Sequence, residues 1–159
     1  MEIYVLRHGI AYDAAPGEPD SERALTPEGK QKLERVLKRA RSAGTRPVTI
    51  LTSPYRRALE TARMAATILE SKVLFETAVL KPGGRPEEIW QEARLYLPEG
   101  PVLLAGHEPV LSETVSYLLG APDLAVDMKK GAIVAIDIPA SSAVPRGVLR
   151  WMLTSKLCS

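Results

Sequence analysis

Short runs of apolar and β-branched residues alternate along this chain with longer stretches in which apolar residues recur every three or four positions. Runs of the first kind predict strands, and the second spacing predicts amphipathic helices. Strands are expected at residues 2–6, 48–52, 72–75 and 102–105. Helices are expected to begin at Pro27, Pro54, Pro86 and Pro109 and to end near Gly44, Glu70, Leu97 and Gly120. Strands that alternate with helices are typical of an α/β protein with a mostly parallel sheet.

Hydroxyl side chains and prolines mark where elements begin and end. Thr26 and Ser53 each precede a proline that opens a helix, so both are expected to be N-caps. Residues 10–25 contain prolines, a glycine and several acids, which predicts an irregular polar loop beside the first strand. The last two apolar runs, at 132–138 and 147–153, predict a hairpin at one sheet edge, joined by a Pro/Ser loop.

Composition narrows the class of protein. A chain of 159 residues with 45% hydrophobic content has the size of one domain, residues 1–159, that needs no disulfides. The net charge of +2 comes from 21 basic and 19 acidic residues spread along the chain, so no nucleic-acid-binding surface is expected. The lone cysteine, Cys158, excludes an intrachain disulfide. With two histidines in the chain, we expect no metal and no cofactor.

Location and assembly follow from weaker signals. No apolar run reaches the roughly 18 residues of a membrane span, and the chain opens directly on its first strand, so a cytoplasmic protein without membrane contact is expected. One core accounts for the predicted apolar faces, which favours a monomer. The absence of asparagine and the 13 prolines are habits of heat-adapted proteins.

Candidate chemistry begins at the end of the first strand, where Arg7, His8 and Gly9 follow an apolar run. Ligands of parallel α/β sheets bind at the carboxyl ends of the strands. Gly9 is expected to let the backbone turn sharply there and approach a ligand closely. We interpret His8 as a nucleophile for phosphate.

A second signal is the pair Arg56 and Arg57 in the first turn of the second predicted helix. Arginine is unfavourable there, because the amino end of a helix already carries partial positive charge. A bound anion would reverse this effect, and a phosphate could meet the helix dipole and a guanidinium together. The alternative is that both arginines are solvated surface residues.

The second histidine, His107, follows the fourth predicted strand, just before another helix. Right-handed crossovers in a parallel sheet would bring all three strand-to-helix junctions to one edge. We therefore expect Arg7, His8, Arg57 and His107 to converge on one site.

Taken together, these segments resemble the histidine phosphatase superfamily, also called the phosphoglycerate mutase-like family. The matching segments are Leu6-Arg7-His8-Gly9, Thr52 to Thr61, and Gly106-His107-Glu108-Pro109. A short chain with Arg23 to Gly29 after its first loop looks most like the small phosphohistidine phosphatases of the SixA type. The resemblance implies a three-layer α/β/α fold with a mostly parallel central sheet. Only 50 positions separate Arg57 from His107, so no large cap insertion is expected over the site.

The resemblance also implies roles for the residues. Neutral His8 would attack phosphorus and form a covalent phosphohistidine that water hydrolyses, without a metal. Arg7, Arg57 and His107 would bind the phosphoryl oxygens, and the two arginines should also lower the pKa of His8. Arg23 is either a further anion contact at the rim or an exposed side chain.

The proton donor stays open at this point. Glu108 resembles the donor of the acid phosphatase branch, but it could equally be an acid that stabilises the first turn of a helix. Weaker candidates are Asp13, Glu18, Asp20 and Glu76. Phosphohistidine has an imidazole leaving group that can be protonated near neutral pH, so its cleavage needs less help than that of an alkyl phosphate.

Three functions remain as hypotheses. The first is a metal-independent phosphohistidine phosphatase acting on a phosphorylated protein such as a histidine-containing phosphotransfer protein, because an open site admits a phosphate presented on a folded partner. The second is a small-molecule phosphomonoesterase. The third is a phosphate-binding module without turnover, which the intact set of Arg7, His8, Arg57 and His107 argues against.

Overall fold

The computed structural model describes residues 1–139 and 143–158. Within these residues six strands form one sheet in the order β3-β2-β4-β1-β5-β6. Their bounds are β1 Glu2–Arg7, β2 Thr49–Thr52, β3 Val73–Glu76, β4 Val102–Gly106, β5 Ile133–Asp137 and β6 Val148–Leu153. The first four strands pair in parallel, whereas β5 and β6 are antiparallel. This confirms the mostly parallel sheet and the hairpin at its edge; residues 140–142 of the predicted Pro/Ser loop lie outside the described residues.

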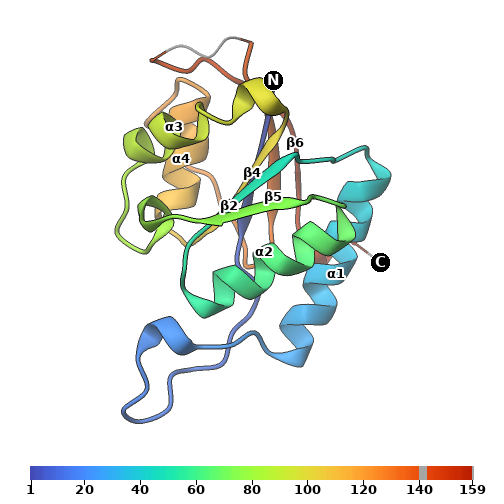
Figure 1. The fold of residues 1–159 in the computed structure, drawn as a ribbon, viewed down its shortest axis with the longest axis vertical. Helices are drawn as coiled ribbons and strands as arrows, with labels where there is room; N and C mark the ends of the chain where they lie inside the picture. The colour runs from blue at the N-terminus through green and yellow to red at the C-terminus, as the bar shows by residue number, and fades with distance from the viewer. Residues whose placement is uncertain (140–142, 159) are drawn as a thin grey trace.

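Helices cover both faces of the sheet (Figure 1). Their bounds are α1 Pro27–Ser42, α2 Arg56–Ile68, α3 Pro86–Ala93 and α4 Val110–Leu118. Helices α1 and α2 lie on one face, and α3 and α4 on the other. The structure therefore has the predicted three-layer α/β/α architecture.

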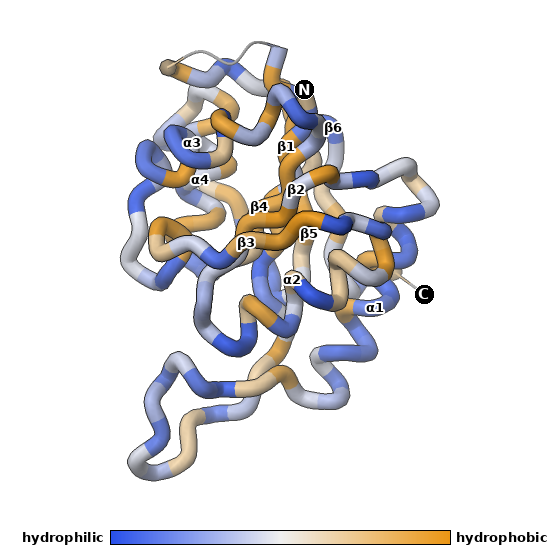
Figure 2. The backbone as a smooth tube through the Cα atoms, viewed as in Figure 1, coloured by the Kyte–Doolittle hydropathy of each residue, from blue (hydrophilic) through white to orange (hydrophobic). Residues whose placement is uncertain are grey.

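A hydrophobic core lies on each face of the sheet, and successive side chains of β1 enter the two cores in turn. Tyr4 and Leu6 pack with α1 and α2, whereas Ile3 and Val5 pack with α3 and α4. Successive strand side chains point to opposite faces, so a strand covered by helices on both sides must be apolar throughout. Figure 2 shows the result as hydrophobic strands enclosed by more polar helices.

Several predicted boundaries need correction. Helix α2 begins at Arg56 rather than Pro54, because Ser53 Oγ accepts the Tyr55 N–H at 3.2 Å and holds a turn before the helix. Ser53 is therefore not the N-cap, whereas Thr26 is, since its hydroxyl accepts the Gly29 N–H. Helix α3 ends at Ala93, although Leu97 is still buried by a separate 3-10 turn.

The loop of residues 10–25 is more ordered than its composition predicts. It contains a 3-10 turn at Asp20–Glu22, and Ala11 pairs with Leu25 across its base. The loop extends beyond the carboxyl ends of the central strands (Figure 1). In the described part of the chain, no helix combines the length and apolar character needed to cross a membrane.

Gly29 fixes the start of α1 against the segment that follows the first strand. A Cβ at this position would lie 2.3 Å from the Ile10 carbonyl oxygen, which also accepts the Thr26 N–H at 2.9 Å. Backbone occupies the space, so a small shift of one side chain cannot relieve the contact. The short distance explains why glycine stands inside the first turn of a helix.

We expect Gly29→Ala to lower the free energy of unfolding by about 1–3 kcal/mol, the usual cost of overpacking. An unconstrained helical glycine would show the opposite sign, because alanine is better by roughly 0.5–1 kcal/mol. Urea unfolding of the variant measures the difference. Lys30→Ala, at the exposed neighbouring position, is the control. A more stable Gly29→Ala protein would contradict the close packing.

Candidate active site

Strand register brings three loops together at the carboxyl edge of the sheet. Arg7 of β1 lies opposite Gly106 of β4, and Thr52 of β2 lies opposite Ala105. The ladder continues one bond further, because His8 N–H donates to Gly106 O and Ser53 N–H donates to Ala105 O, both at 3.0 Å. His8, Ser53 and His107 therefore follow directly from paired backbone, and their positions are fixed by the sheet.

The imidazole of His8 is buried, with 6% of the residue exposed. Its Nδ1 lies 2.7 Å from the Gly9 carbonyl oxygen. Since a carbonyl oxygen only accepts, Nδ1 must carry the proton, and Nε2 keeps a lone pair. The Gly9 bond therefore selects the tautomer in which Nε2 is nucleophilic.

The pKa of His8 is lowered from 6.5 to about 4. Burial is the largest cause, and the charges of Arg57, Arg7 and Lys130 lower it further, while the bond to the Gly9 carbonyl acts in the opposite direction. We predicted the direction but assigned it to the arginines, whose effect is smaller than that of desolvation. The free His8 side chain is neutral at pH 7.

His107 lies beside His8, with ring centroids 5.2 Å apart. Its Nε2 is 2.8 Å from Ser53 Oγ, and the Tyr55 ring packs edge-on at 5.3 Å. The pKa of His107 is lowered to about 3, first by burial and then by the charges of His8 and Arg57. If the Ser53 hydroxyl donates to Nε2, the ring proton of neutral His107 sits on Nδ1, where it can be donated to a ligand.

Buried nitrogen atoms at the site lack partners. Within the described residues, Arg7 Nε, Arg57 Nε and His107 Nδ1 are buried and make no hydrogen bond. Terminal nitrogens of the same arginines have partners, since Arg7 Nη1 donates to Met128 O at 2.8 Å and both terminal nitrogens of Arg57 donate to Asp20. Buried donors normally have acceptors. An oxyanion beside His8 would supply them.

The structure shows what Glu108 and Arg23 contact. Glu108 Oε1 accepts the Ser112 N–H at 2.7 Å in the first turn of α4, as the helix-stabilising alternative predicts. Its charge also interacts with that of Arg7. Arg23 donates to Asp20 Oδ1 and Tyr12 O, so it lies at the rim and reaches the site through Asp20.

The other acids considered as proton donors also differ in their contacts with the site. Asp20 contacts Arg57, and hydrogen bonds from Arg23 and Arg57 lower the pKa of its carboxyl, which makes it a poor proton donor. In the described part of the chain, no hydrogen bond or ion pair joins the side chains of Asp13, Glu18 or Glu76 to the site. Of the five acids considered as proton donors, Asp20 and Glu108 are therefore the two that interact with site residues.

Sequence reasoning assigned no site role to Thr61, Lys130 or Met128. Thr61 Oγ1 accepts the Gly9 N–H at 3.1 Å and donates to Arg57 O at 2.7 Å, which joins the first loop to α2. A buried hydroxyl among the apolar positions of α2 was the available signal. Gly9 has no positive φ, so its backbone conformation does not itself require glycine, and a Cβ there would lie 3.4 Å from Leu25 Cδ2 and 3.5 Å from Gly29 O.

No group of three or more His, Cys, Asp or Glu side chains that could hold a metal ion occurs in residues 1–139 and 143–158. The gathered groups are instead imidazoles, guanidiniums and a lysine, which suit an oxyanion.

Comparison with known proteins agrees with this geometry. The model of the histidine phosphatase superfamily (branch 1) matches residues 3–80. A protein of Picosynechococcus sp. described as uncharacterized is 31% identical over 139 residues, which cover 86% of this chain and 84% of the relative. The chain belongs to the histidine phosphatase superfamily. Members of this superfamily are phosphatases.

Solved structures of superfamily proteins share the fold. The protein histidine phosphatase SixA, solved with tungstate, has a TM-score of 0.86 at 24% identity, with 98% of both chains covered. A mycobacterial glucosyl-3-phosphoglycerate phosphatase has a TM-score of 0.68 at 16% identity, covering 94% of this chain and 96% of the other. A phosphoserine phosphatase from Entamoeba histolytica has a TM-score of 0.65 at 15% identity, with 98% of both chains covered.

The two histidines make a direct test possible. In nitrogen-15 spectra of the ring nitrogens, we expect His8 to be the Nδ1–H tautomer and to stay neutral until about pH 4, because burial opposes its protonation. His107→Asn assigns the signals. The unfolded chain takes up a proton near pH 6.5, so the His8 contribution to stability is complete above that pH and is lost as the pH falls to about 4. Titration of His8 near pH 6.5 in the folded protein would contradict the buried arrangement.

Proposed function

We propose that this protein hydrolyses phosphoryl groups through a covalent phosphohistidine on His8, and that its substrate is a phosphohistidine in a protein. The observation that carries the proposal is the bond between His8 Nδ1 and Gly9 O. It leaves the Nε2 lone pair available beside buried donors that lack acceptors.

The reaction has two steps. First, the free ring nitrogen of the substrate phosphohistidine takes up a proton from water. Nε2 of His8 then attacks phosphorus, the bond from phosphorus to the substrate nitrogen breaks, and the substrate leaves as a neutral imidazole that keeps this proton. Arg7, Arg57 and His107 hold the phosphoryl oxygens, and Lys130 adds positive charge. Positive charge develops on the His8 ring during attack, and the Gly9 carbonyl stabilises it through Nδ1–H. Water then attacks the phosphohistidine, which releases inorganic phosphate and restores neutral His8.

The acids at the site favour phosphohistidine as the substrate. The Asp20 carboxylate is bound by two arginines, and one oxygen of Glu108 accepts a helix N–H. An alkyl phosphate needs a strong proton donor to its leaving oxygen, whereas an imidazole can be protonated near neutral pH without one. A site whose acids are occupied in this way suits the easier leaving group.

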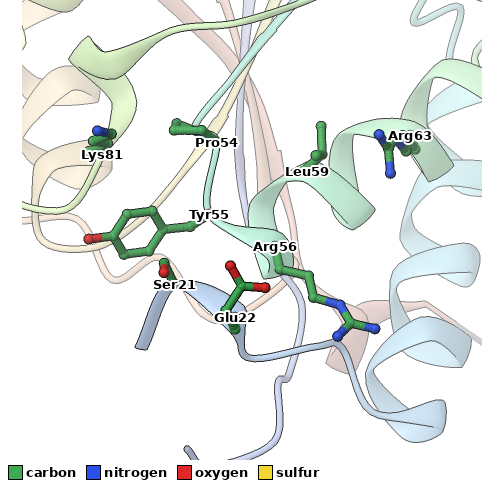
Figure 3. A pocket seen from close by; sticks show the side chains of 8 residues that line it. All are labelled: Ser21, Glu22, Pro54, Tyr55, Arg56, Leu59, Arg63 and Lys81. Atoms are coloured by element: carbon green, nitrogen blue, oxygen red, sulfur yellow. The ribbon is translucent and has the colours of Figure 1, made fainter. Parts of the chain in front are cut away.

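Access to the site supports a protein substrate. Between Arg57 and His107 the chain is used by the rest of α2, β3, α3, β4 and short 3-10 turns, which leaves no cap insertion. Beside the site lies a groove of about 720 Å³ (Figure 3). Tyr55 contacts His107 on one side and lines the groove on the other, so the groove continues outward from the site. A folded partner that presents a phosphorylated side chain would find room there. The fold similarity to SixA points the same way.

A small phosphomonoester is the second candidate. Arg56, Arg63 and Lys81 line the same groove, with Glu22 as its acid (Figure 3). These cations could bind a second anionic group of a small molecule. The glucosyl-3-phosphoglycerate and phosphoserine phosphatases that share the fold act on compounds of this kind.

The first experiment is rapid-quench transfer from a labelled phosphohistidine protein and from an aryl phosphate, without added metal. Wild type should acquire acid-labile, base-stable label, and His8→Ala should acquire none. Faster turnover of the phosphohistidine protein supports the first candidate, and faster turnover of the aryl phosphate supports the second. Phosphate binding without label or turnover would leave only the non-catalytic binding module.

A second test concerns Glu108. The amide oxygen of Glu108→Gln can still accept the Ser112 N–H, but the side chain cannot transfer a proton. Because the helix contact already occupies one Glu108 oxygen, we expect kcat with the phosphohistidine protein to stay within about threefold of wild type. Loss of a general acid would instead cost about 10²–10⁴-fold, most with a poor alkyl leaving group. Glu108→Ala is the control for the helix contact, and Glu113→Gln, in the same helix, is the matched control.

A further inference from the structure

One residue holds the outer edge of the Arg57 guanidinium. Arg57 Nη1 donates to the Asp20 backbone oxygen at 2.9 Å, and Arg57 Nη2 donates to Asp20 Oδ2 at 3.1 Å. The Arg57 side chain is only 6% exposed, whereas that of Asp20 is 57% exposed. The contact therefore joins a buried cation to an acid on the surface of the loop.

Because both terminal nitrogens of Arg57 donate to Asp20, only one edge of the guanidinium is left to bind a ligand. Arginine binds anions through either its two terminal nitrogens or its Nε and one terminal nitrogen, because the five N–H groups lie in a fixed plane. Asp20 occupies the first edge. Arg57 Nε, on the second edge, is buried and lacks a partner within the described residues. The second edge is therefore the one left for a phosphoryl oxygen.

Other contacts fix the plane of the guanidinium. Its centre lies 5.3 Å from the centroid of the Tyr55 ring, and the same ring packs against His107. The backbone of Arg57 is held separately, because its carbonyl oxygen accepts the Thr61 hydroxyl, which in turn accepts the Gly9 N–H. Rotation of the guanidinium in its plane is limited by the two bonds to Asp20.

Asp20 is itself held by the loop. Arg23 Nη1 donates to Asp20 Oδ1 at 3.0 Å, and Arg23 Nε donates to Tyr12 O at 2.6 Å. Each carboxylate oxygen of Asp20 thus faces a different arginine. The pKa of the Asp20 carboxyl is lowered mainly by the Arg23 hydrogen bond, so the group remains a carboxylate at neutral pH.

We propose that Asp20 is a positioning residue, which orients the Arg57 guanidinium so that its Nε edge faces the phosphoryl group. This inference rests on the proposed function. Arg23 supports Asp20, and the chain of contacts makes the order of the 10–25 loop a condition for correct phosphate binding. In this arrangement the guanidinium lies between two anions, the carboxylate outside and the phosphoryl group inside. A rival role is that Asp20 occupies the place of phosphate and must leave before substrate binds.

The test compares Asp20→Ala and Asp20→Asn with Asp13→Asn, a change at an exposed acid of the same loop. We expect kcat/KM to fall about 10²-fold for Asp20→Ala, the scale for a misplaced catalytic group. Asp20→Asn should fall less, because its amide oxygen can still accept from Arg57. Inorganic phosphate should inhibit both variants more weakly than wild type, and Asp13→Asn should behave as wild type. Tighter inhibition of the Asp20 variants by phosphate would establish the rival role and overturn ours.

Two further measurements separate positioning from other roles. Added to Arg57→Ala, the Asp20→Ala change should cost nothing more in kcat/KM, whereas a general structural defect would cost the same in both backgrounds. The loss should also be equal for phosphohistidine and aryl phosphate substrates, whereas loss of a proton donor would grow as the leaving group becomes poorer. Unequal losses, or full additivity, would overturn the inference.

Labelling of wild type is measured first. If wild type forms no phosphohistidine on His8, the proposed function fails. If wild type is labelled and the Asp20 variants match it in rate and in phosphate inhibition, only the positioning role fails.

Discussion

The parallel pairing of β1, β4 and β2 is the constraint on which the site depends. Parallel strands present their carboxyl ends at one edge, and the register places the ends of these three strands level. One further backbone hydrogen bond beyond β1 and one beyond β2 carry this order into the loops. The positions of His8, Ser53 and His107 are therefore set by sheet geometry, and the helices that follow contribute side chains to a frame that already exists.

Within that frame, burial and a single hydrogen bond prepare His8 for chemistry. Desolvation keeps the ring neutral, and the Gly9 carbonyl keeps the proton on Nδ1, which leaves the lone pair on Nε2. The cations that bind an oxyanion also act against protonation of the ring. Burial, the Gly9 bond and the neighbouring cations thus leave a neutral His8 with a free Nε2 lone pair beside positive charge, and the proposed nucleophilic role needs no proton-accepting neighbour.

The sequence predicted what depends on local signals and on topology. Apolar runs located the strands, hydroxyl and proline pairs located the helix starts to within two residues, and right-handed crossovers brought Arg57 and His107 to His8. Contacts between residues far apart in the sequence could not be predicted in the same way. Asp20 was named as an acid, but its bond with Arg57 spans 37 positions, and Ser53 was interpreted as a cap rather than a partner of His107. Met128 contributes a backbone carbonyl, which any residue could supply, so no side-chain pattern marks it.

Residues 128–131 form one side of the site, and they come late in the chain. Met128 O binds Arg7, and the Gly131 N–H reaches the backbone oxygens of both Arg7 and His8. Because residues 128–131 lie in the last third of the chain, they can enclose His8 only after most of the chain has been synthesised. A chain that ends before His107 contains the Arg-His-Gly motif but lacks both the second histidine and residues 128–131. The proposed phosphoryl transfer on His8 therefore requires that residues 128–131 have been synthesised and have folded against the end of β1.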